Sequence, residues 1–217
     1  MQIAIDGPAG AGKSTIAKKL AKESGYIYVD TGAMYRAMAL YLIRNGIKAD
    51  DSEGIEKACV NADISIRYEN GEQIVILNGE NVNGLIRTQE VSNMASASSP
   101  NPKVRKKLVS LQQKLAETAD VVMDGRDIGT KVLPGADVKI FLTASTAVRA
   151  KRRYDELKEK GEECDLETIE KEIVERDERD MNRAESPLVR AEDAVLVDTS
   201  DMDIDEVVGR IRELIWK

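Results

Sequence analysis

The segment from Gly7 to Ser14 limits what this chain can fold into more than any other feature. It reads GPAGAGKS and matches the pattern GxxxxGK[ST] at every fixed position. Its glycines permit left-handed backbone angles, so main-chain N–H groups can close around phosphate oxygens. A short apolar run over residues 2–5 precedes the segment, and helical periodicity extends from Lys13 to Glu23. A strand, a glycine-rich loop and a helix N-terminus in this order predict a binding site for a nucleoside triphosphate.

The side chains of this loop have separate expected roles. Lys13 places a full positive charge beside the β- and γ-phosphates, and Ser14 offers a hydroxyl to Mg²⁺. Asp124, at the end of a later apolar run, is a candidate second contact to the metal through a water molecule. The residues expected to bind ATP are Gly7, Pro8, Ala9, Gly10, Ala11, Gly12, Lys13, Ser14 and Thr15. The alternative interpretation is a glycine-rich turn without a ligand.

Four further short runs rich in β-branched residues alternate with helical segments, at residues 26–30, 120–124, 138–142 and 194–198. A helix is expected from Ala33 to Asn45, ended by Gly46. This alternation predicts an α/β fold with a five-stranded parallel sheet and helices on both faces, the three-layer fold of phosphate-loop NTPases. We expect one domain over residues 1–217, with its core at about 1–45, 102–145 and 185–217.

Two intervals between the expected strands are longer than one crossover needs. Within residues 31–119, runs at 63–68, 73–77 and 80–83 are separated by the turn signals Asn70-Gly71 and Asn78-Gly79, which predicts a small antiparallel meander. We expect this inserted substrate-binding region at about 60–100, with a loop from Ser96 to Pro100. Residues 143–193 are highly charged and are expected to be entirely helical, with a lid at about 146–165.

Composition excludes several classes of protein. The 217 residues include 32 Lys or Arg and 39 Asp or Glu, and the net charge of −7 argues against a broad nucleic-acid surface but leaves a local basic pocket possible. The chain has no histidine, which excludes a Ser/His triad and any His-ligated metal. Cys59 and Cys164 form no CxxC pair, so neither a zinc site nor a redox motif is indicated.

The hydropathy pattern bears on location and partners. No run approaches the roughly 18 apolar residues of a membrane span. The first residues lack the charged segment and long apolar stretch of a signal peptide. We therefore expect a cytoplasmic protein with reduced thiols that binds small molecules and neither nucleic acid nor membrane, and we expect a monomer.

Arginines concentrate where loops should meet the carboxyl edge of the sheet, the edge that carries ligands in this kind of fold. Guanidinium groups suit bidentate binding of phosphate, and several together could neutralise the charge of a transferring phosphoryl group. The arginines in question are Arg36, Arg126, Arg149, Arg152, Arg153, Arg176 and Arg183, with Asp180 on the same helical face as the last two. Surface ion pairs are the alternative explanation for the helical ones.

The fate of the γ-phosphate must be inferred from what surrounds the loop. Asp124 is not followed by a glutamate that could position water, and no NKxD guanine-reading motif is present. Transfer to a bound acceptor is therefore favoured over hydrolysis. A nucleotide-dependent switch remains the alternative from a different class of protein.

In five segments the sequence resembles the bacterial cytidylate kinases, and the resemblance extends over nearly the whole chain. The segments are Gly7–Thr15, Asp30–Arg36, Arg87–Val91, Asp124–Thr130 and Glu175–Arg183. The resemblance implies direct in-line transfer of the ATP γ-phosphate to CMP or dCMP with Mg²⁺, giving ADP and CDP or dCDP. Kinases for UMP, dTMP or a non-nucleotide such as shikimate are the nearest alternatives.

The resemblance also implies a role for individual residues. Ser96, Arg105 and Asp127 would face the cytosine, and Arg176 and Asp180 would hold the sugar hydroxyls. Arg36, Arg126 and Arg183 would bind the acceptor phosphate, with Thr31 nearby. The residues that would act on the transferring group are Lys13, Arg126, Arg153 and Arg183.

The choice of base can be argued from chemistry as well. A carboxylate such as Asp127 accepts a hydrogen bond from the 4-amino group of cytosine and would repel the oxygen that uracil has there. Arg105 and Ser96 can donate to cytosine O2 and N3. The alternative for Asp127 is an ion pair with a neighbouring arginine.

Overall fold

The computed structural model describes residues 1–215. Five parallel strands form the central sheet in the order β2-β6-β1-β7-β8. Their bounds are β1 Gln2–Asp6, β2 Ile27–Asp30, β6 Val121–Gly125, β7 Val138–Thr143 and β8 Val195–Asp198. The predicted parallel α/β fold is confirmed, and each of the five predicted strands is present with ends that differ by about one residue.

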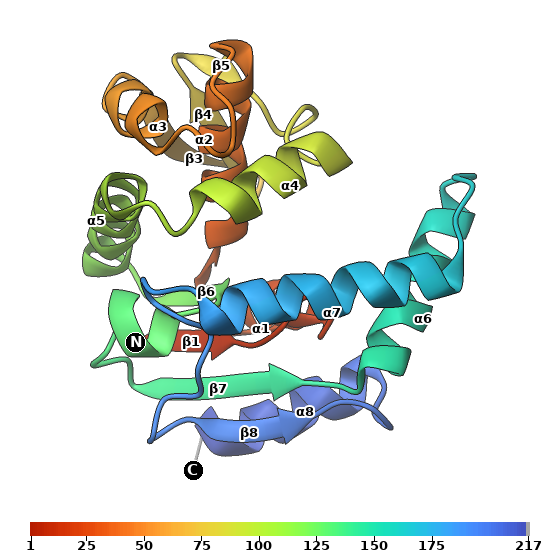
Figure 1. Ribbon diagram of the computed structural model, residues 1–217. Helices are drawn as coiled ribbons and strands as arrows, with labels where there is room; N and C mark the ends of the chain where they lie inside the picture. The colour runs from red at the N-terminus through yellow and green to blue at the C-terminus, as the bar shows by residue number, and fades with distance from the viewer. Residues whose placement is uncertain (216–217) are drawn as a thin grey trace.

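Alternate residues of the central strand β1 face opposite sides of the sheet, and helices cover both sides (Figure 1). Ile3 and Ile5 pack with α1 (Lys13–Ser24) and α8 (Ile204–Ile215). Ala4 belongs to a second cluster with α2 (Thr31–Arg44) and α5 (Pro102–Thr118). This period of two, with both faces apolar, explains why the strand appears in the sequence as a continuous apolar run.

The insertion between β2 and β6 forms a second, antiparallel sheet with the order β3-β4-β5. Its strands are β3 Ile64–Glu69, β4 Glu72–Leu77 and β5 Glu80–Asn81, and it is accompanied by the helices α3 Ser52–Cys59 and α4 Gln89–Ser98. Asn70, Gly71, Asn78 and Gly79 all have positive φ, between 49° and 85°, as tight hairpin turns require. The predicted meander is therefore present.

The segment between β7 and β8 contains two helices that pack against each other, α6 (Thr146–Glu159) and α7 (Leu166–Asn182). Both extend beyond the sheet at the right of Figure 1. The expectation that residues 143–193 are entirely helical was wrong for residues 143–145, for the link 160–165 between the two helices, and for residues 183–193. There Ser186 takes a φ of 51° before Pro187, and the N–H of Leu188 donates to the carbonyl of Asp180 at 2.8 Å, so the chain turns back toward the sheet.

Two other local predictions need correction. The Ser96–Pro100 stretch was expected to be a loop, but Ser96 to Ser98 form the last turn of α4. The Thr88 hydroxyl caps this helix, and Val91 and Met94 are buried against the core, so packing outweighs the weak helix propensity of serine. In addition, α2 begins at Thr31 rather than Ala33. The Asp30 carboxylate accepts a hydrogen bond from the N–H of Ala33 at 2.8 Å and so caps the N-terminus of the helix.

Three remaining points concern a π-helical turn, membrane-spanning helices and the end of the chain. A π-helical turn, η1 (Ile128–Val132), follows β6. Within residues 1–215 no helix is both long enough and apolar enough to cross a membrane. The last two positions of the core segment expected at 185–217 lie outside the described residues.

Candidate active site

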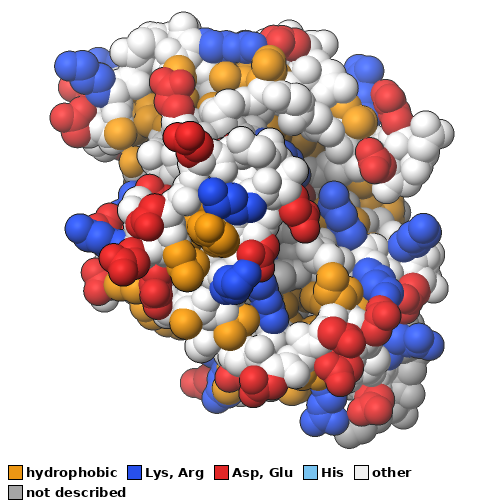
Figure 2. Space-filling view, turned by 90° about the vertical axis from the view of Figure 1, so that its right-hand side faces the viewer, with side chains coloured by type: hydrophobic (Ala, Val, Ile, Leu, Met, Phe, Trp, Pro, Cys, Tyr) orange, Lys and Arg blue, Asp and Glu red, His pale blue; other side chains and the backbone are white. Residues whose placement is uncertain are grey.

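A cavity of about 970 Å³ lies at the carboxyl ends of β1, β2 and β6, between the inserted region and the α6–α7 pair. Figure 2 shows it as a hollow with basic side chains along its border. The residues predicted to bind or act on a substrate line this cavity, except Gly7, Pro8 and the candidate arginine Arg149. The structure thus brings together residues as far apart in the chain as Ala9 and Arg183.

The loop between β1 and α1 has the conformation that its glycines allow. Gly7, Gly10 and Gly12 have φ values of 144°, 75° and 85°. A Cβ on Gly7 would lie 1.9 Å from the carbonyl oxygen of Leu142 on β7, so this position excludes any side chain. Gly12 is the N-cap of α1 and no side chain caps that helix, which leaves the first-turn N–H groups available to phosphate oxygens.

Lys13 lies folded against the loop. Its Nζ donates to the carbonyl of Pro8 at 2.6 Å, and the residue is buried. Burial lowers the pKa of Lys13 well below its usual range, the nearby Arg126 lowers it further, and Asp124 opposes both. Polyanionic phosphates beside this ammonium group would favour its charged form.

Ser14 and Asp124 form a hydroxyl–carboxylate arrangement that would suit Mg²⁺ in the part of the cavity next to the loop. Ser14 Oγ donates to Asp124 at 2.8 Å, and Tyr28 Oη donates to the other carboxylate oxygen at 2.9 Å. Burial raises the pKa of Asp124, the neighbouring Asp30 raises it further, and Lys13 opposes this. Mg²⁺ prefers one or two such protein oxygens completed by phosphate and water, so these residues fit the ion.

The arginines of α6 separate into different roles. Arg149 does not line the cavity; it is buried, pairs with Asp177 of α7 at 2.6 Å and donates to the carbonyl of Ala9 at 2.9 Å, so it supports the phosphate loop from outside. Arg153 does line the cavity, but in this structure it pairs with Glu156 at 3.0 Å and is half exposed. Arg149 thus takes part in a structural ion pair, while Arg153 lies at the cavity with a partner on its own helix.

Two arginines at the far end of the cavity are held by carboxylates. Arg36 pairs with Asp30 at 3.1 Å, and Arg126 pairs with Asp180 at 2.8 Å. Burial raises the pKa of Asp180, but Arg126 outweighs it and holds this pKa below its ordinary value. The carboxylates fix where the guanidinium groups point and leave part of each one available to another anion.

Several buried polar atoms around this end of the cavity have no hydrogen-bond partner. They are the Nε of Arg36 and of Arg176, the Nη2 of Arg183, and the hydroxyl oxygens of Ser96 and Tyr35. Burial and the nearby Arg126 lower the pKa of Arg176 to about 10, which leaves it charged at neutral pH. Buried unsatisfied donors are costly, so their convergence on one cavity points to an anionic, hydrogen-bonding ligand.

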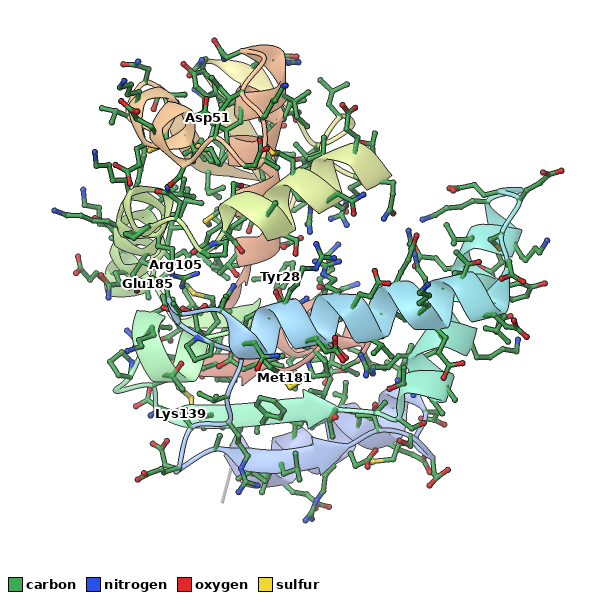
Figure 3. All side chains as sticks on the ribbon, viewed as in Figure 1. Tyr28, Asp51, Arg105, Lys139, Met181 and Glu185 are labelled. Carbon is green, nitrogen blue, oxygen red and sulfur yellow. The ribbon has the colours of Figure 1, made fainter. Side chains whose placement is uncertain are left out.

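Arg105 and Asp127 form a buried ion pair beside this cluster, and Arg105 Nε also donates to Ser186 at 3.1 Å. Arg183 lies 3.9 Å from the other oxygen of Asp127. Figure 3 labels Arg105 beside Glu185, where the chain leaves α7. Burial raises the pKa of Asp127, although both arginines oppose it. The pair gives the cavity one donor group and one acceptor group within reach of the same ligand.

Comparison with known proteins agrees with this geometry. The family model described as Cytidylate kinase matches residues 3–217. A cytidylate kinase of Caldicellulosiruptor saccharolyticus is 52% identical over 217 residues, which cover 100% of this chain and 96% of that protein. A cytidylate kinase of Ligilactobacillus salivarius is 51% identical over 215 residues, covering 99% and 96%. The chain belongs to the cytidylate kinase family.

Membership of the cytidylate kinase family makes the protein a nucleoside monophosphate kinase, an enzyme that transfers a phosphate group. This confirms the resemblance and sets aside the alternative of a nucleotide-dependent switch. A solved structure of an uncharacterized protein from Eubacterium ventriosum aligns with a TM-score of 0.56 at 15% identity, over 99% of this chain and 98% of that chain. That likeness concerns the fold alone.

Some residues of this cytidylate kinase family site were not singled out from the sequence. Tyr35 lines the cavity, and the guanidinium of Arg105 lies 5.7 Å from the centre of its ring. Tyr28 holds Asp124. The position of Tyr35 directly before Arg36 was the available signal, whereas nothing in the sequence indicates that Tyr28 reaches across to Asp124.

Proposed function

We propose that the enzyme transfers the γ-phosphate of ATP to CMP or dCMP, giving ADP and the corresponding diphosphate. The observation that carries the proposal is one cavity with a phosphate loop at one end and, at the other, the Arg105–Asp127 pair among unpartnered buried donors. The names of the relatives point the same way. ATP occupies the loop end and the acceptor nucleotide occupies the arginine end.

The assignment of the acceptor follows from its chemical parts. Arg36, Arg126 and Arg183, with Thr31 nearby, bind the acceptor phosphate, and the unpartnered Nε of Arg36 and Nη2 of Arg183 support this role. Arg176 and Asp180 hold the sugar. Asp127 accepts a hydrogen bond from the 4-amino group of cytosine, while Arg105 and Ser96 donate to its O2 and N3. A uracil would leave Asp127 facing an oxygen, so a site of this kind rejects UMP.

Transfer requires no covalent enzyme intermediate. An oxygen of the acceptor phosphate forms a bond to the γ-phosphorus while the bond from that phosphorus to the β,γ-bridging oxygen breaks, and ADP leaves with the electron pair. Lys13, the loop N–H groups and the guanidinium groups of Arg126, Arg153 and Arg183 hold the reactants in line and offset the negative charge. Mg²⁺ held by Ser14, with Asp124 behind it, would add positive charge at the β- and γ-phosphates.

Water must be kept from the γ-phosphate during transfer. The lid over residues 146–165 closes over ATP and carries Arg153 inward from its pair with Glu156, and the inserted region moves when CMP binds. Ligand-free crystals and crystals with both nucleotide sites filled should differ in the position of α6. Superimposable lids in the two would contradict this step.

A panel of acceptors tests the substrate directly. CMP, dCMP, UMP, dTMP, AMP and shikimate are each supplied with ATP and Mg²⁺, and ADP release is followed in a coupled assay. CMP and dCMP should give the highest kcat/KM. A higher value for any other acceptor, or ADP release that needs no acceptor, would refute the proposed substrate. The same preparation in light scattering tests the proposed monomer, and cell fractionation tests the proposed cytoplasmic location.

A further inference from the structure

The outer edge of β2 is covered by side chains of the inserted sheet. β2 is the last strand of the central sheet and pairs with β6 on one side only. On its other side, the amide of Gln73 on β4 accepts the N–H of Asp30 at 2.9 Å and donates to the carbonyl of the same residue at 3.1 Å. The hydroxyl of Tyr68 on β3 donates to the carbonyl of Tyr28 at 3.1 Å. These bonds satisfy backbone groups that an edge strand otherwise leaves unpaired.

The two residues of β2 that receive these bonds both belong to the site. The Asp30 carboxylate caps α2 and pairs with Arg36 at 3.1 Å, and Arg87 approaches it to 3.4 Å. The Tyr28 hydroxyl donates to Asp124, which is bonded to Ser14. A displacement of the end of β2 would therefore move two side chains together. One is Asp30, which holds Arg36, and the other is Tyr28, which holds Asp124 at the candidate metal site.

Gln73 is well suited to hold a peptide group and is itself held. A carboxamide offers one donor and one acceptor in the same plane, which matches the N–H and C=O of a single residue. Asn83 fixes the backbone of Gln73, because its Nδ2 donates to the Gln73 carbonyl at 2.8 Å and its Oδ1 accepts the N–H of Val75 at 2.9 Å. Burial raises the pKa of Tyr68, so its hydroxyl stays a donor.

We propose that Gln73 and Tyr68 are positioning residues of the inserted sheet, which hold the end of β2 so that Asp30 aims Arg36 at the acceptor phosphate. The inference rests on the proposed function, since it takes Arg36 to bind that phosphate. It gives the inserted sheet a role in the geometry of the site, in addition to its role as part of the cavity wall.

Substitutions that remove only the polar atoms test this role. Gln73→Met removes both amide bonds and Tyr68→Phe removes one hydroxyl. Gln113→Met and Tyr26→Phe are matched controls, since these side chains bond the Val132 carbonyl at 3.0 Å and the Met1 sulfur at 3.2 Å, neither of which lines the cavity. Gln73→Met should raise KM for CMP about tenfold, in line with the loss of a hydrogen-bonded support, and Tyr68→Phe by a smaller factor. KM for ATP should change by a smaller factor than KM for CMP in Gln73→Met, whose amide bonds Asp30, and both control variants should keep both KM values within about twofold of wild type.

A double-mutant cycle with Arg36→Ala separates this inference from the proposed function. Arg36→Ala alone should raise KM for CMP, and Gln73→Met should add little in that background, because it acts through Arg36. If Arg36→Ala leaves KM for CMP unchanged, the proposed function has the wrong phosphate ligand. If Arg36→Ala raises KM but Gln73→Met and Tyr68→Phe do not, or if they raise it equally in both backgrounds, the positioning role is overturned.

Discussion

The hydroxyl of Ser14 and the carboxylate of Asp124 lie 2.8 Å apart, although 110 residues separate them in the chain. The pairing arises because β1 and β6 are parallel neighbours, so the loop after one strand and the last residues of the other meet at the same edge. Tyr28 from β2 then fixes the second oxygen of the carboxylate. Three adjacent strands thus build the place where the proposed Mg²⁺ would be held.

Replacement of Ser14 by alanine should weaken the affinity of the enzyme for Mg²⁺ to a measurable degree. The substitution removes one metal ligand but leaves Asp124 and Tyr28 in place, and changes of this kind cost about 10- to 100-fold in metal affinity or activity. Titration of kcat against free Mg²⁺ should show a higher half-saturating concentration. An unchanged titration curve would remove Ser14 from the metal site.

Lys13→Met should reduce kcat by about 10²–10³-fold, as expected for loss of one preorganised charge beside the transferring phosphate. The methionine keeps the apolar stem in its buried position. Lys22→Met, an exposed position near the end of the same helix, serves as the control and should keep wild-type kcat. Steady-state assays at saturating CMP measure kcat for both variants. Equal kcat values would refute the assigned role of Lys13.

Asp127→Asn should narrow the preference for CMP over UMP. The asparagine can donate to the uracil oxygen that the carboxylate repels, so the ratio of kcat/KM for CMP to that for UMP should fall by about tenfold or more. The variant keeps a side-chain oxygen next to Arg105 and is therefore less disruptive than Asp127→Ala, which would leave a buried arginine unpaired. An unchanged ratio would show that Asp127 does not read the base.

Asp6, directly before the phosphate loop, should make stability depend on pH. It is buried and accepts the N–H groups of Ile128 and Gly129 at 2.8 and 2.7 Å, yet burial raises its pKa from the ordinary value of 3.8 to about 6. Since the folded state favours the protonated form, the contribution of Asp6 is fully present below about pH 4 and is lost as the pH rises through about 6. The pKa difference corresponds to about 3 kcal/mol.

Urea unfolding between pH 4 and 7 measures this effect. The free energy of unfolding of Asp6→Asn minus that of the wild-type protein should increase by about 2 kcal/mol from pH 4 to pH 7, because the wild-type protein loses stability as Asp6 ionises and the asparagine does not ionise. Parallel pH profiles for the two proteins would mean that Asp6 titrates at its ordinary pKa in the folded state.

The sequence was informative wherever the signal is local. The loop from Gly7 to Ser14 and the hairpin turns at Asn70-Gly71 and Asn78-Gly79 depend on the backbone angles of neighbouring residues, and the structure shows those angles. The five strands were found because burial on both faces produces continuous apolar runs.

What the sequence did not indicate depends on segments that meet only in the folded chain. Ser96 was expected in a loop because its serine neighbours have weak helix propensity. The packing of α4 on α2, which stabilises the helix, cannot be read from these residues alone. No local pattern reveals that Gln73 bonds both backbone groups of Asp30, or that Arg149 pairs with Asp177 instead of facing the cavity. Residue type and spacing identify candidate charges, but the partner of each charge is decided by topology.

The most direct test of the account is a crystal structure with a bisubstrate analogue, in which adenosine and cytidine are joined through a chain of phosphates. The account predicts that the phosphate chain begins at Lys13 and the loop N–H groups, runs past Arg36 and Arg126, and ends with the cytosine against Asp127. A cytosine bound elsewhere, with Asp127 contacting only Arg105 and Arg183, would contradict it.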